Sequence, residues 1–153
     1  MTQRDTRVLL ADAPGAGRRA IAALLLSLPG IALVSEAGSL EELALERRRT
    51  APDVIVIDDR LLGAAGLGPR DADVPFVVMG LDDDPSFARR ARRIGATAWI
   101  AKEHADDLLP GALDDARRGA TPGDRRPDGA GKPQPCDTES PMHDGDRRPS
   151  MEP

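Results

Sequence analysis

The fold of this chain is decided by one stretch, Pro52-Asp53-Val54-Ile55-Val56-Ile57-Asp58-Asp59-Arg60-Leu61-Leu62-Gly63. Residues 54–57 of this stretch are apolar and β-branched and follow one another without alternation. A short apolar run of this kind is typical of a central parallel strand that is buried on both faces of its sheet. The stretch therefore predicts an α/β fold organised around this strand.

Two aspartates, Asp58 and Asp59, stand where that strand would leave its sheet. In open α/β folds, the carboxyl edge of the sheet is where ligands bind. A carboxylate at that edge can bind a cation, act as a base or accept a phosphoryl group. The plainer alternative is that the two acids only end the strand and open a turn.

The rest of the first 118 residues alternates between strand patterns and helix patterns. Strands are expected at residues 7–11, 31–37, 76–79 and 98–101, and helices at 15–28, 39–49, 84–94 and 106–118. Between the central strand and the strand at 76–79 there is room for one helical turn, near 64–67, so this third helix is expected to be short or absent. The alternation predicts a doubly wound parallel sheet with helices on both faces.

Local signals mark several helix ends. Ser39 and Glu42 have the spacing of a capping box. Asp84 followed by Pro85 is a strong helix start, with the aspartate as N-cap and the proline in the first helical position. Gly95 is expected to cap the other end of that helix.

Composition limits the class of protein. The chain has 153 residues, a formal net charge of −5 and a single cysteine, Cys136. Its N-terminus lacks the apolar core of a signal peptide, and no run approaches the ~20 apolar residues that a membrane span needs. These features predict a cytoplasmic protein without a membrane segment and argue against a nucleic-acid surface over the whole molecule.

The composition changes near residue 119. Proline and glycine make up 12 of the last 35 residues, and few apolar residues remain. Residues 119–153 are therefore expected to form a disordered tail without a DNA-binding domain, after a flexible segment at 1–6 and one domain at 7–118.

Polar residues stand at the ends of three predicted strands. Asp12 follows the first strand, Asp58 the third and Lys102 the fifth. If the sheet is parallel, these side chains meet at one edge. Two carboxylates there can share a divalent cation such as Mg²⁺, and the lysine can pair with an anionic group.

The blocks at residues 7–12, 52–58 and 95–102 resemble the receiver domains of two-component response regulators, and most of all the receivers of NarL-type transcription regulators. The resemblance covers residues 7–118. It implies a flavodoxin-like five-stranded sheet of order 2-1-3-4-5. It also implies a signalling module of a phosphorelay rather than an enzyme, with a histidine kinase as partner.

The resemblance assigns roles to individual residues. Asp58 matches the phosphoryl acceptor, and Lys102 matches the lysine that contacts the phosphoryl group. Asp12, Asp58 and the backbone carbonyl of Arg60 match the ligands of Mg²⁺. Trp99 lies where the family has its switching tyrosine or phenylalanine.

Departures from the family pattern fall on the same site. Ala13 replaces the second residue of the acidic pair, and Gly80 replaces the Ser or Thr that binds the phosphoryl group. Asp59 is not expected to substitute, because adjacent strand residues point to opposite faces, whereas the acids at 82–84 could supply a ligand. These losses predict an atypical stand-alone receiver with a weak Mg²⁺ site, in which Asp58 is a weak or vestigial acceptor and the output is protein–protein contact.

The resemblance also implies a homodimer through residues 85–117, the face that carries dimerisation and output in the family. Pro110 weakens that expectation, because a proline inside the last helix removes a backbone hydrogen bond and costs ~3 kcal/mol. The helix could instead begin afresh at Pro110.

A different function stays open. Residues 15–20 read Gly-Ala-Gly-Arg-Arg-Ala, which fits the dinucleotide-binding pattern, and Glu36 follows at a suitable distance. The alternative is therefore a small nucleotide-binding protein that uses the loop from Gly15 to Gly17. Against it, the turn after the first strand is too long for a tight pyrophosphate loop, and Asp12 would repel phosphates.

The other charged residues and the histidines give weaker indications of function. The four arginines within 89–93 are expected on a solvated helix face, with the binding of acids as the alternative. His104 and His143 have no metal-ligand spacing and are expected to be exposed.

Overall fold

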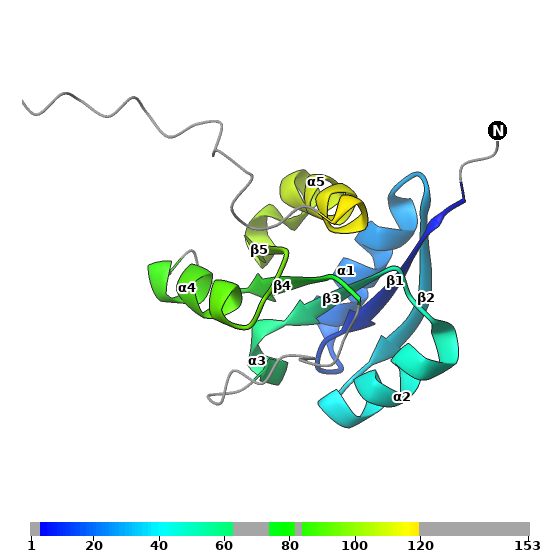
Figure 1. Cartoon of the computed structure of the whole chain (residues 1–153), viewed down its shortest axis with the longest axis horizontal. Coiled ribbons are helices and arrows are strands. Elements are labelled where there is room, and N and C mark those ends of the chain that lie inside the picture. Colours follow the sequence, from blue (N-terminus) through cyan, green and yellow to red (C-terminus); the bar gives the residue numbers. More distant parts are fainter. Residues whose placement is uncertain (1–3, 63–73, 82–83, 120–153) are drawn as a thin grey trace, which may run out of the picture.

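The computed structural model describes residues 4–62, 74–81 and 84–119 (Figure 1). Strands and helices alternate along the chain in the order β1 (Thr6–Ala11), α1 (Ala16–Ser27), β2 (Ile31–Ala37), α2 (Leu40–Thr50), β3 (Val54–Asp58), α3 (Asp59–Leu62), β4 (Phe76–Gly80), α4 (Pro85–Arg93), β5 (Ala98–Ala101), the 3₁₀ turn η1 (Lys102–His104) and α5 (Ala105–Arg118). Among the described residues, no helix is long and apolar enough to cross a membrane.

The five strands form one sheet in the order β2-β1-β3-β4-β5, and every neighbouring pair is parallel. The flavodoxin-like sheet of order 2-1-3-4-5 predicted above is thereby confirmed. β3 lies at the centre, and all five of its residues are buried. Because all strands run in the same direction, their carboxyl ends lie at one edge of the sheet.

Helices cover both faces of the sheet (Figure 1). One apolar cluster of side chains packs on each face and holds the layers together. Val54 and Val56 face α1 and α5, while Ile55 and Ile57 face α2, α3 and α4. This is why the sequence of β3 shows no alternation: both of its faces are covered.

The expected helix caps form, with one difference. The Ser39 hydroxyl accepts a hydrogen bond from the Glu42 amide at 3.1 Å, as in a capping box, but the Glu42 carboxylate accepts from the amide of Gly38 rather than Ser39. The Asp84 carboxylate accepts from the Ser86 amide at 2.8 Å and caps α4. Gly95 adopts φ 85° directly after the helix, a conformation that glycine enters without strain.

Several boundaries differ from the sequence prediction. β3 and β4 each extend one residue further, to Asp58 and Gly80. The third helix is short and begins at Asp59, not near residue 64; the segment 64–67 lies outside the described residues, as do 120–153.

The last helix does not begin afresh at Pro110. α5 is continuous from Ala105 to Arg118, with Pro110 exposed inside it. The burial of Leu109 and Leu113 on either side of the proline holds this helix against the sheet, so that tertiary packing offsets the lost hydrogen bond.

Candidate functional site

Three strand ends bring Asp12, Asp58 and Lys102 together at the carboxyl edge of the sheet, as predicted. The side chains of Asp12 and Asp58 are only 1 % and 2 % exposed. The Lys102 ammonium donates to Asp12 Oδ2 at 2.7 Å and forms an ion pair with Asp58 Oδ2. A single lysine thus bridges two buried carboxylates that lie 46 residues apart in the sequence.

Arg60 is the second cation of the site, although only its backbone carbonyl was assigned a role from the sequence. Its amide donates to Asp58 Oδ1 at 2.7 Å, and its guanidinium contacts the same carboxylate at 3.2 and 3.4 Å. The guanidinium also lies 3.9 Å from Asp12 Oδ1. Because Asp58 ends β3 and Arg60 comes two residues later, the arginine side chain folds back over both acids.

The protonation of Asp58 reflects these contacts. Burial alone would raise its pKa, but hydrogen bonds from Lys102 and Arg60 outweigh burial, so the pKa of Asp58 lies below its ordinary value. Asp58 is therefore a carboxylate at neutral pH. Each of its oxygens is already engaged by a cation, which makes it a less reactive nucleophile than a carboxylate open to solvent.

The donor set does not fit the Mg²⁺ that the resemblance implies. Within the described ranges, no three acidic, histidine or cysteine side chains cluster as a metal site. Ala13 is exposed and offers no oxygen beyond its backbone. Asp12 and Asp58 instead contact two cationic side chains, which a divalent ion would have to displace.

The acids considered as replacement ligands do not complete a set of Mg²⁺ ligands. Asp84 is committed to the start of α4, where it accepts hydrogen bonds from the amide and hydroxyl of Ser86. Residues 82 and 83 lie outside the described part of the chain. Asp59 points to another partner, Arg90 of α4, which donates to both of its carboxylate oxygens.

Gly80 lies at the end of β4 against the ring of Phe87 in α4. A Cβ at residue 80 would lie 3.0 Å from Phe87 Cζ, closer than packed carbon atoms ordinarily come. The aromatic ring therefore fills the space that a Ser or Thr side chain would need. No sequence pattern pointed to Phe87, because its contact with Gly80 is made only when α4 packs on β4.

A hollow of about 240 Å³ opens beside Asp58. Its walls include the three residues just described as partners, Asp59, Arg90 and Phe87, together with Arg60 and Gly80. The hollow gives a small anionic group access to the Asp58 side of the site, past the exposed Arg60 side chain.

Trp99 sits in β5, three residues before Lys102. It is half-buried against the apolar cluster on the α4 face, and the Arg92 guanidinium lies 4.7 Å from the centroid of its ring. A cation over an indole face is a favourable contact that restrains the ring. The structure therefore ties the predicted switch position to α4 in the conformation described.

The loop from Gly15 to Gly17, which would bind a nucleotide in the alternative function, does not have the surroundings that a dinucleotide site needs. α1 begins at Ala16, so Gly17 already lies in its first turn, and Glu36 forms an ion pair with Arg18 at 3.6 Å. The acid that would bind a ribose is thus partnered by the helix itself. No observation at this loop favours a dinucleotide.

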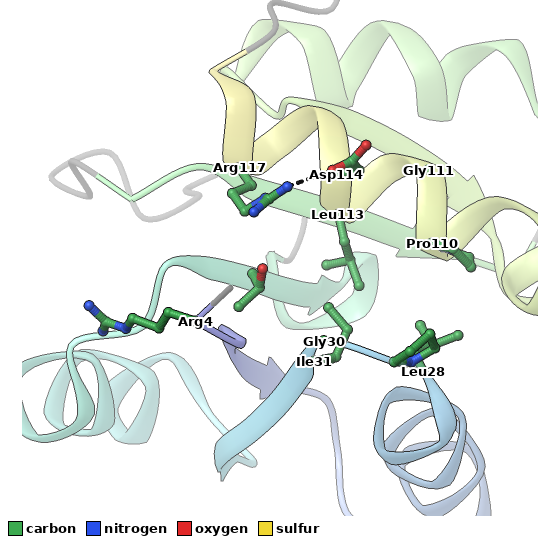
Figure 2. Close-up of a pocket in the computed structure, with 11 residues that line it drawn as sticks. Arg4, Leu28, Gly30, Ile31, Pro110, Gly111, Leu113, Asp114 and Arg117 are labelled. Atoms are coloured by element: carbon green, nitrogen blue, oxygen red, sulfur yellow. Dashed lines mark hydrogen bonds and ion pairs between the residues drawn. The ribbon is translucent and has the colours of Figure 1, made fainter. Parts of the chain in front are cut away.

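A larger hollow, of about 610 Å³, lies at the opposite edge of the sheet (Figure 2). It is lined by the start of β1, the turn before β2 and α5, and within it Arg117 is paired with Asp114 at 3.1 Å. Because β1 begins here and ends at the acidic site, the two hollows lie at opposite ends of the sheet. Asp12, Asp58 and Lys102 do not line this larger one.

Comparisons with known proteins agree with this geometry. No protein-family model matches the chain. It is 28% identical over 102 residues to the response regulator GacA of Pseudomonas viridiflava, a match that covers 63% of this chain and 48% of that protein, so the chain spans about half the length of this curated relative. A LuxR-family two-component response regulator from Aurantimonas sp. superposes with a TM-score of 0.68 at 26% identity, covering 76% of this chain and 88% of that one.

The chain resembles the receiver domains of response regulators in fold and in sequence. The response regulator domain of Thermotoga maritima CheB shares the fold, with a TM-score of 0.65 at 20% identity over 75% of this chain and 98% of that one. At this site, the strand-end acids and the lysine were located from the sequence. It missed the Arg60 side chain, because Arg60 reaches the acids from α3, directly after the strand, where strand periodicity no longer applies.

Proposed function

We propose that this receiver domain is a signalling module of a two-component phosphorelay in which Asp58 is a weak phosphoryl acceptor and the output is protein–protein contact. The observation that carries the proposal is the buried constellation of Asp12, Asp58 and Lys102 at the carboxyl edge of a sheet with receiver topology. The similarity to response regulators supports a histidine kinase as the phosphoryl donor.

The transfer proposed for Asp58 is a substitution at phosphorus. A carboxylate oxygen of Asp58 forms a bond to the phosphorus atom, the bond from phosphorus to the donor oxygen or nitrogen breaks, and the leaving group departs with that electron pair. Lys102, which contacts Asp58 Oδ2, is placed to pair with a phosphoryl oxygen on the product. Catalysis of this kind depends on positioning and on neutralising charge.

Two features support a weak acceptor. Both oxygens of Asp58 are held by Arg60 or Lys102, so attack requires one of these contacts to lengthen. Gly80 carries no hydroxyl, and the ring of Phe87 crowds the position that a side chain there would take. The acyl phosphate, once formed, lacks the side-chain contact that would draw the end of β4 toward it.

The surface of α4, β5 and α5 is the proposed contact face, including a homodimer through residues 85–117. α4 exposes three arginines, Arg89, Arg92 and Arg93, while the first turn of α5 exposes Asp106 and Asp107. A basic helix beside an acidic one suits a partner, or a second copy, with the opposite arrangement. Sedimentation at increasing concentration tests it: a strict monomer contradicts the homodimer.

The acceptor is tested by incubating the wild type, Asp58→Asn and Asp59→Asn with acetyl phosphate and resolving the phosphoprotein on a phosphate-affinity gel. Slow, partial labelling of the wild type is expected. It should be lost in Asp58→Asn and retained in Asp59→Asn, which is the matched control because Asp59 is engaged by Arg90 instead.

Two results would contradict the proposal. Labelling that persists in Asp58→Asn would place the acceptor elsewhere. Rapid and near-stoichiometric labelling of the wild type would show an efficient acceptor and refute the weakness assigned to it.

A further inference from the structure

We infer that the Arg60 guanidinium, together with the Lys102 ammonium, supplies the positive charge that a divalent cation would bring to Asp12 and Asp58, so that this acidic pocket is complete without metal. The inference concerns the same site as the proposed function, but it does not require a phosphoryl group on Asp58. It assigns a resident cation to a site where the resemblance implies Mg²⁺.

The first support is the count of charges in the pocket. Two carboxylates meet one ammonium and one guanidinium, so the group of four is formally neutral. A carboxylate at residue 13 and no guanidinium would leave the same pocket with an excess of two negative charges, which a divalent cation balances. With Ala13 and Arg60, a divalent cation would instead create an excess of positive charge.

The second support is that both cations span both acids. Lys102 lies between Asp58 Oδ2 and Asp12 Oδ2, and Arg60 reaches Asp58 Oδ1 at 3.2 Å and Asp12 Oδ1 at 3.9 Å. A shared metal ion would likewise bridge two carboxylates. The fork of a guanidinium suits this bridging, because it presents several N–H donors in one plane.

The third support is the position of Arg60 at the mouth of the site. Its side chain is 61% exposed, whereas the Lys102 side chain is 12% exposed. The guanidinium therefore covers the acids from the solvent side, the side from which an ion would enter. An ion pair exposed to water adds little to the stability of a fold. Arg60 is thus a cation that competes with Mg²⁺ and can also be removed by mutation without unfolding the domain.

The test measures Mg²⁺ binding without any phosphoryl donor, by titration calorimetry and by the fluorescence of Trp99, the single tryptophan of the chain. Wild type is compared with Arg60→Ala, with Arg60→Lys and with Arg19→Ala, an exposed arginine of α1 whose loss changes the net charge equally. We expect no saturation of the wild type at the ~1 mM scale of weak protein cation sites. Arg60→Ala should bind at least about fivefold more tightly, the factor that corresponds to 1 kcal/mol.

The controls separate the local effect from net charge. Arg19→Ala should behave as the wild type, and Arg60→Lys should stay close to it, because the charge is kept while the fork is lost. Saturable binding of Mg²⁺ to the wild type below ~1 mM, or an equal gain in Arg60→Ala and Arg19→Ala, would overturn the inference.

Ala13→Asp makes the test decisive if every single variant binds too weakly to measure. The new carboxylate adds the missing acid beside Asp12, which brings the affinity into range. In that background, Arg60→Ala should again increase the Mg²⁺ affinity by about fivefold or more. Equal affinities with and without Arg60 would overturn the inference.

Thermal unfolding gives a second readout. Mg²⁺ should raise the midpoint of Arg60→Ala, because an ion that binds only the folded state stabilises it, and should leave the wild type unchanged. A failure of phosphoryl labelling with these Mg²⁺ results intact would refute the proposed function alone. Tight Mg²⁺ binding by the wild type, with normal labelling, would refute only the resident-cation inference.

Discussion

The ring of Phe87 lies against Gly80 so closely that a Cβ on Gly80 would come within 3.0 Å of Phe87 Cζ. Phe87 is 6% exposed and belongs to the apolar cluster between α4 and the sheet. The absence of a side chain at residue 80 is therefore a condition for seating α4 on the end of β4. The same contact disfavours the hydroxyl-bearing side chain that the resemblance to receivers implies at this position.

Gly80→Ala is expected to lower the free energy of unfolding by about 1–3 kcal/mol, the usual cost of overpacking a core. Gly17→Ala is the matched control, since a Cβ there meets only Lys102 Nζ, at 3.9 Å. In α1 that change should be neutral or stabilising, because alanine favours a helix. Chemical denaturation of both variants measures the difference. Similar effects at the two positions would show that the Phe87 contact is not what constrains residue 80.

Asp58→Asn is expected to destabilise the domain, by about 1–3 kcal/mol, because Lys102 and Arg60 lose a buried anionic partner. A pocket with excess negative charge would respond in the opposite direction, since removing an acid there relieves repulsion. Thermal unfolding near neutral pH distinguishes the two. A higher midpoint for Asp58→Asn would contradict the neutral charge balance described above.

The stability difference between the wild type and Asp58→Asn is expected to depend on pH. The pKa of Asp58 in the folded protein lies below its ordinary value of 3.8, so the unfolded chain takes up a proton first as the pH falls. The contribution of the carboxylate is complete above the ordinary pKa and is lost as the pH falls through the folded pKa. The stability difference between wild type and Asp58→Asn should therefore shrink below about pH 4. A stability difference that stays constant down to strongly acidic pH would argue against a lowered pKa of Asp58 in the folded protein.

Ala51→Gly is expected to stabilise the domain by about 1 kcal/mol. Ala51 ends α2 in the left-handed conformation, with φ 44° and ψ 64°, which is unfavourable for a residue with a Cβ. Ala44→Gly is the control, because that residue is exposed within the same helix, where glycine should cost about 1 kcal/mol instead. Denaturation midpoints that move in the same direction for both variants would contradict the argument.

Asp59 and Arg90 are expected to be coupled by about 1 kcal/mol in a double-mutant cycle of Asp59→Asn and Arg90→Gln. Their bidentate ion pair is half-buried and joins the residue after Asp58 to α4. Arg89→Gln, on the exposed side of α4, should show no coupling to Asp59. A coupling of equal size for Arg89 would mean that general electrostatics, not this pair, is measured.

The architecture and the position of the site follow from local sequence patterns. An apolar β-branched run at β3, alternating with helix signals on both sides, can bury both of its faces only in a parallel doubly wound sheet. That topology brings all the strand ends to one edge, so Asp12, Asp58 and Lys102 could be placed together before any contact was known. The helix caps at Ser39 and Asp84 depend on residues that are close in the sequence, and they form where expected.

The tertiary structure decided what surrounds that site. The direction of the Arg60 side chain, the ring of Phe87 over Gly80 and the pairing of Asp59 with Arg90 each depend on how α3 and α4 pack against the sheet. The continuity of α5 through Pro110 depended on burial of its neighbours rather than on helix propensity. Periodicity fixes which face of an element is apolar, but contacts between distant segments depend on packing, and such contacts set the charge and shape of the pocket at Asp58.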